Sequence, residues 1–429
     1  MSTQLLKITA RAKRDPKARF TSLAPVLTPD FLRETWRQLN RKGASGIDGE
    51  TLAEFESNLE ERIADLWRRL KAGQYQAPPV RRVEIPKGKG KTRPLGIPTG
   101  EDRLLQRAVA RLLRAIYEQD FLACSFGYRT GRNPHMALKA LRDHIGTGKV
   151  RHVYETDMQG YFTNRNHQWV RKMIALRIAD PVITGLIGKW LKAGVMEHGV
   201  GARPDAGTPQ GGPMSPCLAN VYLHYVLDLW FEKRAKRDMQ GEAYLTRFVD
   251  DFVGAVQYKR DAEHFDRKLK IRLKIFGLRL TPEKTRMILF GRFARERAES
   301  YGMKPGTFEF LGFKHVSGID TKGKFAVVRI PSEKSCRKFL DSTSEWLRRH
   351  RHWRRRDQQR YLASTLKGFY QYFARNRGVP KLARVKHHVE KQWRHAIKRQ
   401  SQRHRVFWSY LRSRSWFELP QPKVLHPGF

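Results

Sequence analysis

Residues 244–256 read Tyr-Leu-Thr-Arg-Phe-Val-Asp-Asp-Phe-Val-Gly-Ala-Val and set two adjacent carboxylates, Asp250 and Asp251, between two short apolar runs. Because successive side chains of a strand point to opposite faces, the stretch predicts a strand, a tight turn at the acidic pair and a second strand. Two acids at one turn repel each other, and burial would raise their pKa values unless a cation lies between them. The pair therefore suggests a metal site, although Asp-Asp is also an ordinary turn sequence.

A third carboxylate, Asp157, lies in the stretch Val-Arg-His-Val-Tyr-Glu-Thr-Asp-Met-Gln-Gly-Tyr-Phe at 150–162. The sequence predicts a short strand that ends near Asp157, followed by a Gly-containing bend that presents Phe162. A strand-end carboxylate and a hairpin acidic pair in a basic chain favour two-metal phosphoryl transfer. In that chemistry, two cations about 3.5–4 Å apart bind the attacking and the leaving oxygens.

The charge of the chain points to a polyanionic partner. Its 429 residues contain 85 Lys and Arg against 41 Asp and Glu, a formal net charge of +44. Nucleic acid is the leading partner on this ground and a membrane surface is the second. The sequence has no run of about 18 apolar residues and no signal-peptide pattern at its start, which argues against membrane spanning and secretion. Its three scattered cysteines predict reduced thiols in a cytoplasm.

Two further stretches suit contact with phosphates. Residues 80–98 predict two strands joined by a loop of alternating Lys and Gly, which could close over a triphosphate or simply form a solvated hairpin tip. Gln210, Gly211 and Gly212 come just before a helix that Ser215-Pro216 is expected to start. A helix N-terminus favours contact with a phosphate or a base pair.

The order of six short motifs carries a family resemblance. They are Arg-Pro-Leu-Gly-Ile-Pro (93–98), Asp-x-x-Gly-Tyr-Phe (157–162), Pro-Gln-Gly-Gly-Pro-x-Ser-Pro (209–216), Phe-Val-Asp-Asp (248–251), Gly-Leu-Arg-Leu (277–280) with Lys284-Thr, and Phe-Leu-Gly-Phe (310–313). From about residue 26 onward the chain resembles the reverse transcriptases of bacterial group II intron-encoded proteins and their group II-like relatives. The resemblance implies an α+β, right-hand polymerase fold. Its expected parts are fingers (26–150), a palm (151–330) and a helical basic thumb or maturase-like domain X (331–429). Residues 1–25, which precede the resemblance, are basic and show little periodicity, and they are expected to form a mobile or loosely docked N-terminal arm.

The resemblance also implies roles for single residues. Asp157, Asp250 and Asp251 match the catalytic carboxylates that bind Mg²⁺, with Mn²⁺ as a possible substitute. The residues that match deoxynucleotide contacts are Lys87, Arg93, Phe162, Gln210 and Lys284, where Phe162 excludes a 2′-hydroxyl and Lys284 has a structural salt bridge as its alternative role. The residues that match contacts with primer or template are Phe248, Gly211 and Gly212. Phe248 and Val249 depart from the Tyr and Ala that the family often has before the acidic pair.

The C-terminal quarter is especially basic. Residues 331–429 contain 25 Lys and Arg against 6 Asp and Glu, with five tryptophans interleaved at 346, 353, 393, 408 and 416. Helical periodicity is visible near 333–350, 356–375 and 382–400. The pattern predicts a helical bundle that grips a nucleic-acid backbone, with an ordinary helical domain and a solvated charged face as the alternative.

The sequence thus predicts an RNA-directed DNA polymerase that extends a DNA or RNA primer on an RNA template with deoxynucleotides. Intron RNA is a further possible partner, no membrane is expected, and the expected location is the bacterial cytoplasm at the nucleoid. Two alternatives stay open at this point. One is a domesticated polymerase acting in DNA repair, and the other is a splicing maturase that only binds RNA.

Overall fold

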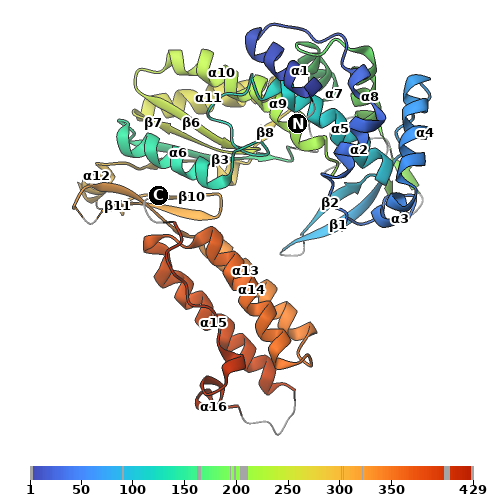
Figure 1. Cartoon of the computed structure of the whole chain (residues 1–429). Coiled ribbons are helices and arrows are strands. Elements are labelled where there is room, and N and C mark those ends of the chain that lie inside the picture. The colour runs from blue at the N-terminus through green and yellow to red at the C-terminus, as the bar shows by residue number, and fades with distance from the viewer. Residues whose placement is uncertain are drawn as a thin grey trace.

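The computed structural model describes residues 3–88, 91–161, 166–193, 195–197, 200–202, 211–300, 302, 304–320, 322–400 and 406–426. A broad body of helices and sheets carries an elongated helical projection formed by the C-terminal residues (Figure 1). The α+β class predicted from the sequence is confirmed. In the described part of the chain, no helix is both long and apolar enough to span a membrane.

The central sheet of the body is antiparallel and contains the predicted acidic hairpin. Its strands follow the order β6-β7-β3-β8, and β9 pairs with the same edge of β3 as β8 does. Their bounds are β3 His152–Gln159, β6 Ala243–Phe248, β7 Asp251–Val256, β8 Arg279–Leu280 and β9 Arg286–Leu289. The strand, turn and strand predicted for 244–256 are therefore confirmed.

Helices cover both faces of this sheet because alternate side chains of its strands are apolar on both sides. On one face, α6 (Pro134–Thr147) packs in a buried cluster with Val153 and Val253. On the other face, α11 (Lys259–Ile275) places Phe265 edge-on against Tyr154, with 5.4 Å between ring centroids. The same face is covered by α9 (Ser215–Leu223), the π-helical turn η2 (His224–Asp228) and α10 (Leu229–Lys233).

A second lobe lies beside the sheet, at the right of Figure 1. It contains a four-stranded sheet in the order β2-β1-β4-β5, in which β1 and β2 form the long hairpin predicted for 80–98. The strands are β1 Val80–Gly88, β2 Lys91–Ile97, β4 Val195–Glu197 and β5 Val200–Ala202. The helices packed around it are α2 Pro29–Trp36, α3 Leu52–Ser57, α4 Leu59–Lys71, α5 Gly100–Tyr117, α7 His167–Ala175 and α8 Pro181–Lys192.

The N-terminal segment differs from the loosely docked arm predicted for residues 1–25. Thr3–Arg14 form helix α1, which packs against α5 and buries Leu5 and Ala12. Farther along, the backbone amides of Leu23 and Ala24 donate to the buried carboxylate of Asp180 at 2.6 and 2.8 Å. This docking could not be predicted from the sequence, because the partner carboxylate lies more than 150 residues away.

A three-stranded sheet joins the body to the C-terminal helices. It consists of β10 Thr307–Phe310, β11 Phe313–Ile319 and β12 Phe325–Pro331, and it follows the short helix α12 (Ala294–Ser300). The projection then contains α13 Glu333–Arg349, α14 Arg355–Phe373, α15 Val379–Lys398 and α16 Trp408–Arg412. The first three confirm the helices predicted in this quarter to within two or three residues. Single 3₁₀ turns occupy Ala24–Val26, Ala235–Asp238, Pro282–Lys284, Asn376–Gly378 and Ser415–Phe417.

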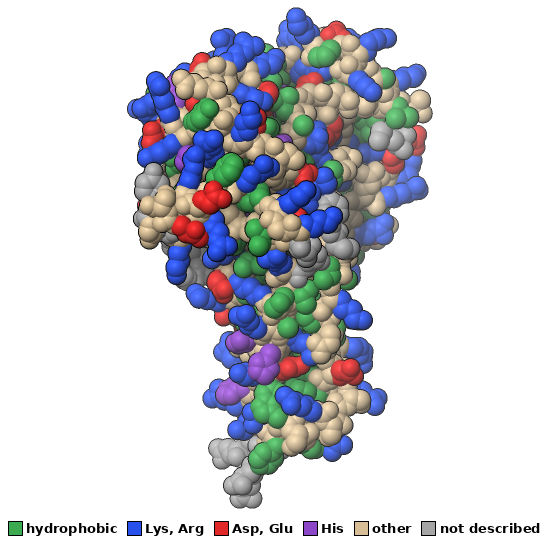
Figure 2. All heavy atoms as spheres, turned by 90° about the vertical axis from the view of Figure 1, so that its left-hand side faces the viewer, with side chains coloured by type: hydrophobic (Ala, Val, Ile, Leu, Met, Phe, Trp, Pro, Cys, Tyr) green, Lys and Arg blue, Asp and Glu red, His purple; other side chains and the backbone are tan. Residues whose placement is uncertain are grey.

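The tryptophans of the projection belong largely to its core. Trp393 is fully buried and donates its indole N–H to Gln358 Oε1 at 2.7 Å. Trp346 stacks on Tyr361, while Trp353 keeps about half of its surface exposed. Lys and Arg side chains cover the outside of the projection and of the body on the face that Figure 2 shows. The exposed Lys and Arg side chains are therefore available to bind a nucleic-acid backbone, as the sequence predicts. Trp393, by contrast, stabilises the bundle and is not available to nucleic acid.

His315 of β11 makes stability depend on pH. Its ring is fully buried, stacks on Phe308 with 4.5 Å between centroids, and has a pKa lowered to about 3, chiefly by burial and next by Arg329. Below about pH 6.5 the unfolded chain binds a proton that the folded chain refuses, so stability falls as the pH drops. The unfolding free energy of the wild type falls between pH 7 and pH 5, and about 2 kcal/mol of that fall comes from His315. We expect His315→Phe to lack this contribution. Denaturant unfolding at both pH values measures it, and equal losses in the two proteins would contradict it.

Candidate active site

The acidic pair lies at the tip of the hairpin formed by β6 and β7. Phe248 pairs with Asp251 across the hairpin, which leaves Val249 and Asp250 as its two-residue turn. Asp157 lies directly opposite Asp251 in the ladder between β3 and β7. Strand β3 continues two residues beyond Asp157, to Gln159, so this carboxylate lies inside the strand and not at its predicted end. The pairing brings the three predicted carboxylates to one edge of the sheet.

Burial and mutual repulsion act on the two hairpin carboxylates. Burial, followed by the negative charges of Asp157, Asp250 and Glu155, raises the pKa of Asp251 to about 7. Burial also raises the pKa of Asp250, and Asp157 adds to the effect. The backbone amide of Leu311, from the Phe-Leu-Gly-Phe motif, partly offsets the rise at Asp251 with a hydrogen bond. A site of this kind favours a bound cation, because a cation would stabilise the charged form of both acids.

Asp157 has a cation partner already. Its Oδ2 atom accepts an ion-pair hydrogen bond from Lys284 Nζ, and both side chains keep solvent contact, with 34% and 57% of their surfaces exposed. The structure therefore shows the structural salt bridge that the sequence offered as one reading of Lys284. Because exposed pairs of this kind contribute only about 0–1 kcal/mol, a stronger cation could displace the ammonium group.

The donor atoms of the three carboxylates suit a hard divalent cation, since Mg²⁺ prefers oxygen ligands and usually takes only one or two carboxylates from the protein. Among the residues that the structure describes, no group of three His, Cys, Asp or Glu side chains is gathered tightly enough to hold a metal ion. The chemistry of Asp157, Asp250 and Asp251 thus fits Mg²⁺, while the approach of their side chains is incomplete in this conformation.

A buried ion pair that the sequence reading missed lies directly beneath the turn. Arg247 and Asp228 are both fully buried and form two hydrogen bonds, from Nε to Oδ1 at 2.7 Å and from Nη2 to Oδ2 at 2.6 Å. The same guanidinium donates to Ser125 Oγ at 2.7 Å, to Asn220 Oδ1 at 3.2 Å and to the carbonyl oxygen of Val249 at 2.9 Å. One sequence signal could have revealed it, because Arg247 is a charged residue within a strand that is otherwise apolar on that side.

The ion pair helps to hold an unusual backbone. Val249 has φ +60°, a left-handed conformation that is costly for a β-branched residue. Its side chain is buried against Gly127, where an added Cβ would lie 2.4 Å from Val249 Cγ2. Asn220 fixes that glycine by donating to its carbonyl oxygen at 2.7 Å. The departure of this turn from the usual family sequence is thus matched by tight packing around it.

Of the other predicted residues, Arg93, Gly211 and Gly212 have neighbours that the structure describes. Arg93, on β2, lies close enough to Asp250 for its charge to lower the pKa of that acid. Gly211 has φ +127°, and an added Cβ there would lie 2.6 Å from the carbonyl oxygen of Gly96, so Gly211 packs against the Arg-Pro-Leu-Gly-Ile-Pro motif. A Cβ on Gly212 would likewise lie 2.5 Å from Gln106 Oε1.

Phe248 is half buried and packs against the apolar clusters on both sides of the sheet. Phe162, Gln210 and the side chain of Lys87 lie outside the described residues. Their predicted contacts, like those of Phe248 with the primer, stay predictions.

Comparisons with known proteins agree with this site. The family model described as "Reverse transcriptase (RNA-dependent DNA polymerase)" matches residues 85–315. Protein YkfC of Escherichia coli (strain K12) is 32% identical over 366 residues, which cover 80% of this chain and 95% of YkfC. Group II intron-encoded protein LtrA of Lactococcus lactis subsp. cremoris is 39% identical over 225 residues, which cover 52% of this chain but only 37% of LtrA. The putative COX1/OXI3 intron 1 protein of Saccharomyces cerevisiae is 28% identical over 204 residues, 47% of this chain and 24% of that protein.

These matches agree with the predicted right-hand polymerase fold, and they favour a group II-like reverse transcriptase over a repair polymerase or a binding-only maturase. The matched region spans the hairpin β1–β2, the carboxylates on β3 and β7 and the Phe-Leu-Gly-Phe motif. The chain therefore belongs to the reverse transcriptase family and is of the group II intron-like type.

Proposed function

We propose that this protein catalyses RNA-directed DNA synthesis, in which the 3′-hydroxyl of a primer attacks the α-phosphate of a deoxynucleotide and releases pyrophosphate. The observation that supports this most directly is the pairing of Asp157 with Asp251 beside Asp250 at the hairpin tip. The raised pKa values of the two hairpin acids support a cation at this edge of the sheet.

Asp157, Asp250 and Asp251 would hold Mg²⁺, with Mn²⁺ as a substitute. When bound, two such ions supply charge stabilisation to the attacking and the leaving oxygens. Lys284 would give up its ion pair with Asp157 and lie free to neutralise the leaving pyrophosphate. The buried pair of Arg247 and Asp228 would keep the turn in one conformation, so that Asp250 meets the substrate in a fixed place.

On the nucleotide side, Arg93 is the residue with the best structural support, because its charge already reaches Asp250. Lys87 would bind the triphosphate with it, Phe162 would select the deoxyribose, and Gln210 would contact the nucleotide. Gly211 and Gly212 would let the backbone approach the template closely, as they already approach β2 and α5.

The helical projection from 331 onward would act as the thumb, 26–150 as the fingers and 151–330 as the palm. The Lys and Arg excess of the helical projection favours a duplex of RNA template and DNA or RNA primer as the bound partner. Binding of intron RNA, with a role in intron splicing or mobility, rests on the name of the relative LtrA. A location in the bacterial cytoplasm at the nucleoid completes this proposal.

Primer extension tests the proposal. We expect the purified protein to extend a DNA primer on an RNA template with deoxynucleotides and Mg²⁺, and to lose that activity on metal removal by EDTA. Restoring Mg²⁺ should restore synthesis, because the backbone pairing of β3, β7 and β6 that brings the three residues together does not involve the ion. Parallel reactions on a DNA template of the same sequence measure template preference. Absence of RNA-templated synthesis in Mg²⁺ and in Mn²⁺ would rule the proposal out.

A further inference from the structure

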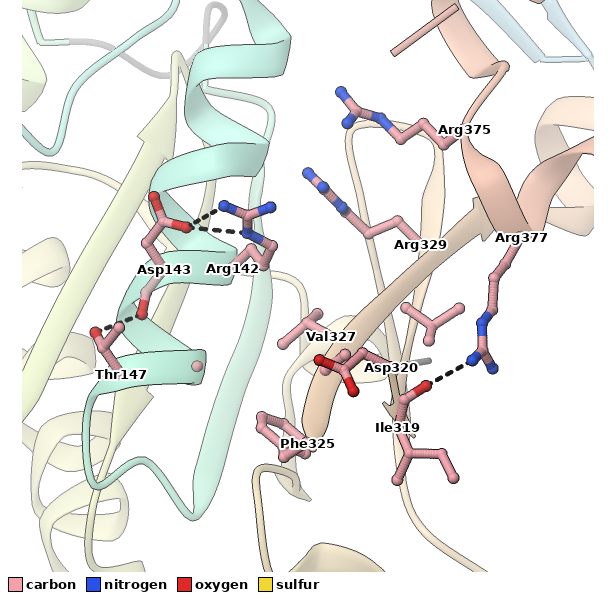
Figure 3. Close-up of a pocket in the computed structure, with 13 residues that line it drawn as sticks. Arg142, Asp143, Thr147, Ile319, Asp320, Phe325, Val327, Arg329, Arg375 and Arg377 are labelled. Carbon is pink, nitrogen blue, oxygen red and sulfur yellow. Dashed lines mark hydrogen bonds and ion pairs between the residues drawn. The ribbon is translucent and has the colours of Figure 1, made fainter. Parts of the chain in front are cut away.

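A strongly basic pocket lies where the body meets the helical projection. It has a volume of about 560 Å³ and opens between α6, the two long strands β11 and β12, and the turn after α14. Four arginines line it, and two aspartates are the acids among its lining residues: Arg142, Arg329, Arg375, Arg377, Asp143 and Asp320. Figure 3 shows the side chains of Arg329 and Arg375 extending toward the side of the pocket where Arg142 lies, while the guanidinium of Arg142 is bonded to Asp143.

Arg329 is the residue that makes this pocket unusual. Only 4% of its surface is exposed, and neither Nη1 nor Nη2 has a hydrogen-bond partner. Burial, followed by the charges of the nearby Arg375 and Arg142, lowers the pKa of its guanidinium to about 9. A buried guanidinium without partners is costly, because desolvation of its N–H groups is not offset by hydrogen bonds.

The two acids that line the pocket are engaged elsewhere. Asp143 accepts hydrogen bonds from Lys139 at 2.7 Å and from Arg142 at 2.6 Å. Asp320 accepts the backbone N–H groups of Lys322 and Lys324 at 2.8 and 2.9 Å. Neither acid accepts a hydrogen bond from Arg329 Nη1 or Nη2, although the charge of Asp143 partly offsets the lowering of the Arg329 pKa.

The neighbouring arginines have partners of their own. Arg375 bonds to His135 Nδ1 at 2.7 Å, where the ring must accept because burial and Arg375 lower the pKa of His135 to about 4. Arg377 donates to the carbonyl oxygen of Ile319 at 2.6 Å. The acceptors of these two hydrogen bonds are uncharged. The positive charge of Arg375 and Arg377 at the pocket is therefore not cancelled.

We propose that this pocket binds a phosphate group, with the Arg329 fork as its central donor. The planar guanidinium presents parallel N–H groups that match two phosphate oxygens, and a phosphate would offset the repulsion among the surrounding arginines. The phosphate belongs either to the backbone of a bound nucleic-acid strand or to a free phosphate or nucleotide, for which the pocket volume is sufficient. The lining of the pocket contains none of the three carboxylates, so phosphate binding there can be measured separately from polymerase activity.

Binding measurements on Arg329→Met test the site with the full chain. In the wild type, inorganic phosphate should raise the melting temperature above that in chloride of equal ionic strength, because it binds only the folded protein. In R329M the rise should vanish, while the melting temperature without phosphate stays equal or increases because a buried unpartnered charge is gone. Arg260→Met is the matched control, since Arg260 is exposed on α11, outside the pocket, and carries the same charge. It should respond to phosphate as the wild type does.

A single-stranded RNA oligonucleotide distinguishes the two sources of the phosphate. If a strand occupies the pocket, R329M should bind RNA about tenfold more weakly, and the slope of log affinity against log salt should shrink by about 0.7. If the ligand is a free phosphate or nucleotide, RNA affinity stays unchanged while the response to phosphate is lost. Should R329M not fold, Arg329→Lys retains the charge without the fork and should show a weakened phosphate response. Equal phosphate and RNA responses in wild type and variant would overturn the proposal.

Discussion

Replacing Asp250 by asparagine is expected to lower RNA-templated primer extension by about 10³-fold while leaving the protein as stable as the wild type or more stable. The activity loss follows because an amide is a poor ligand for Mg²⁺, and charge stabilisation at a phosphoryl-transfer site amounts to several kcal/mol. The stability result follows from the structure, in which burial and the charge of Asp157 raise the pKa of Asp250. Removing that charge relieves a repulsion in the metal-free protein.

Two measurements separate the effects of D250N. Primer-extension rates at saturating Mg²⁺ report activity, and thermal unfolding in EDTA reports stability. Glu61→Gln is a suitable control, because Glu61 is exposed on α4 and loses the same single charge far from the hairpin. Activity within tenfold of the wild type would remove Asp250 from the catalytic set. A large drop in melting temperature would instead mean that the carboxylate stabilises the fold.

The local elements of this fold were open to prediction from the sequence. The hairpin at 244–256, the hairpin at 80–98 and the three long helices of the last quarter all appear within a few residues of their expected bounds. Each depends on short-range information, namely alternation, helical periodicity and turn residues. The order of the six motifs predicted the family and, through it, the right-hand polymerase fold.

Long-range pairs of polar residues were not open to prediction. Asp180 bonds the N-terminal segment from more than 150 residues away, and Arg329 meets Arg142 only because β12 passes beside α6. A buried charge looks in sequence like any surface charge, since its partner is chosen by tertiary packing. Helix α1 was not predicted for the same reason, because its apolar side forms part of the core only through packing against α5. The same holds for the partner of Arg247.

Truncating Asp228 to alanine is expected to lower the free energy of unfolding by about 3–5 kcal/mol, because it leaves the fully buried Arg247 without its counter-charge. Arg247→Met should lower the free energy of unfolding by a similar amount, because it leaves the buried Asp228 without its counter-charge. The double variant D228A/R247M should lose less than the sum of the two, since no unpaired charge remains. Denaturant unfolding of the four proteins gives the coupling. Strictly additive losses would show that the two residues do not act as a pair.

Activity should respond differently from stability in this set. The carbonyl oxygen of Val249 receives its hydrogen bond from Arg247, and that bond holds a residue with φ +60° next to Asp250. In D228A/R247M the bond is lost whatever stability returns, so the turn can relax and displace Asp250. Primer extension should therefore remain at least about tenfold below wild type at a temperature where all four proteins are folded, with the affinity for primer–template unchanged. Recovery of activity in step with stability would instead make Arg247 a residue of the core alone, with no part in positioning the catalytic turn.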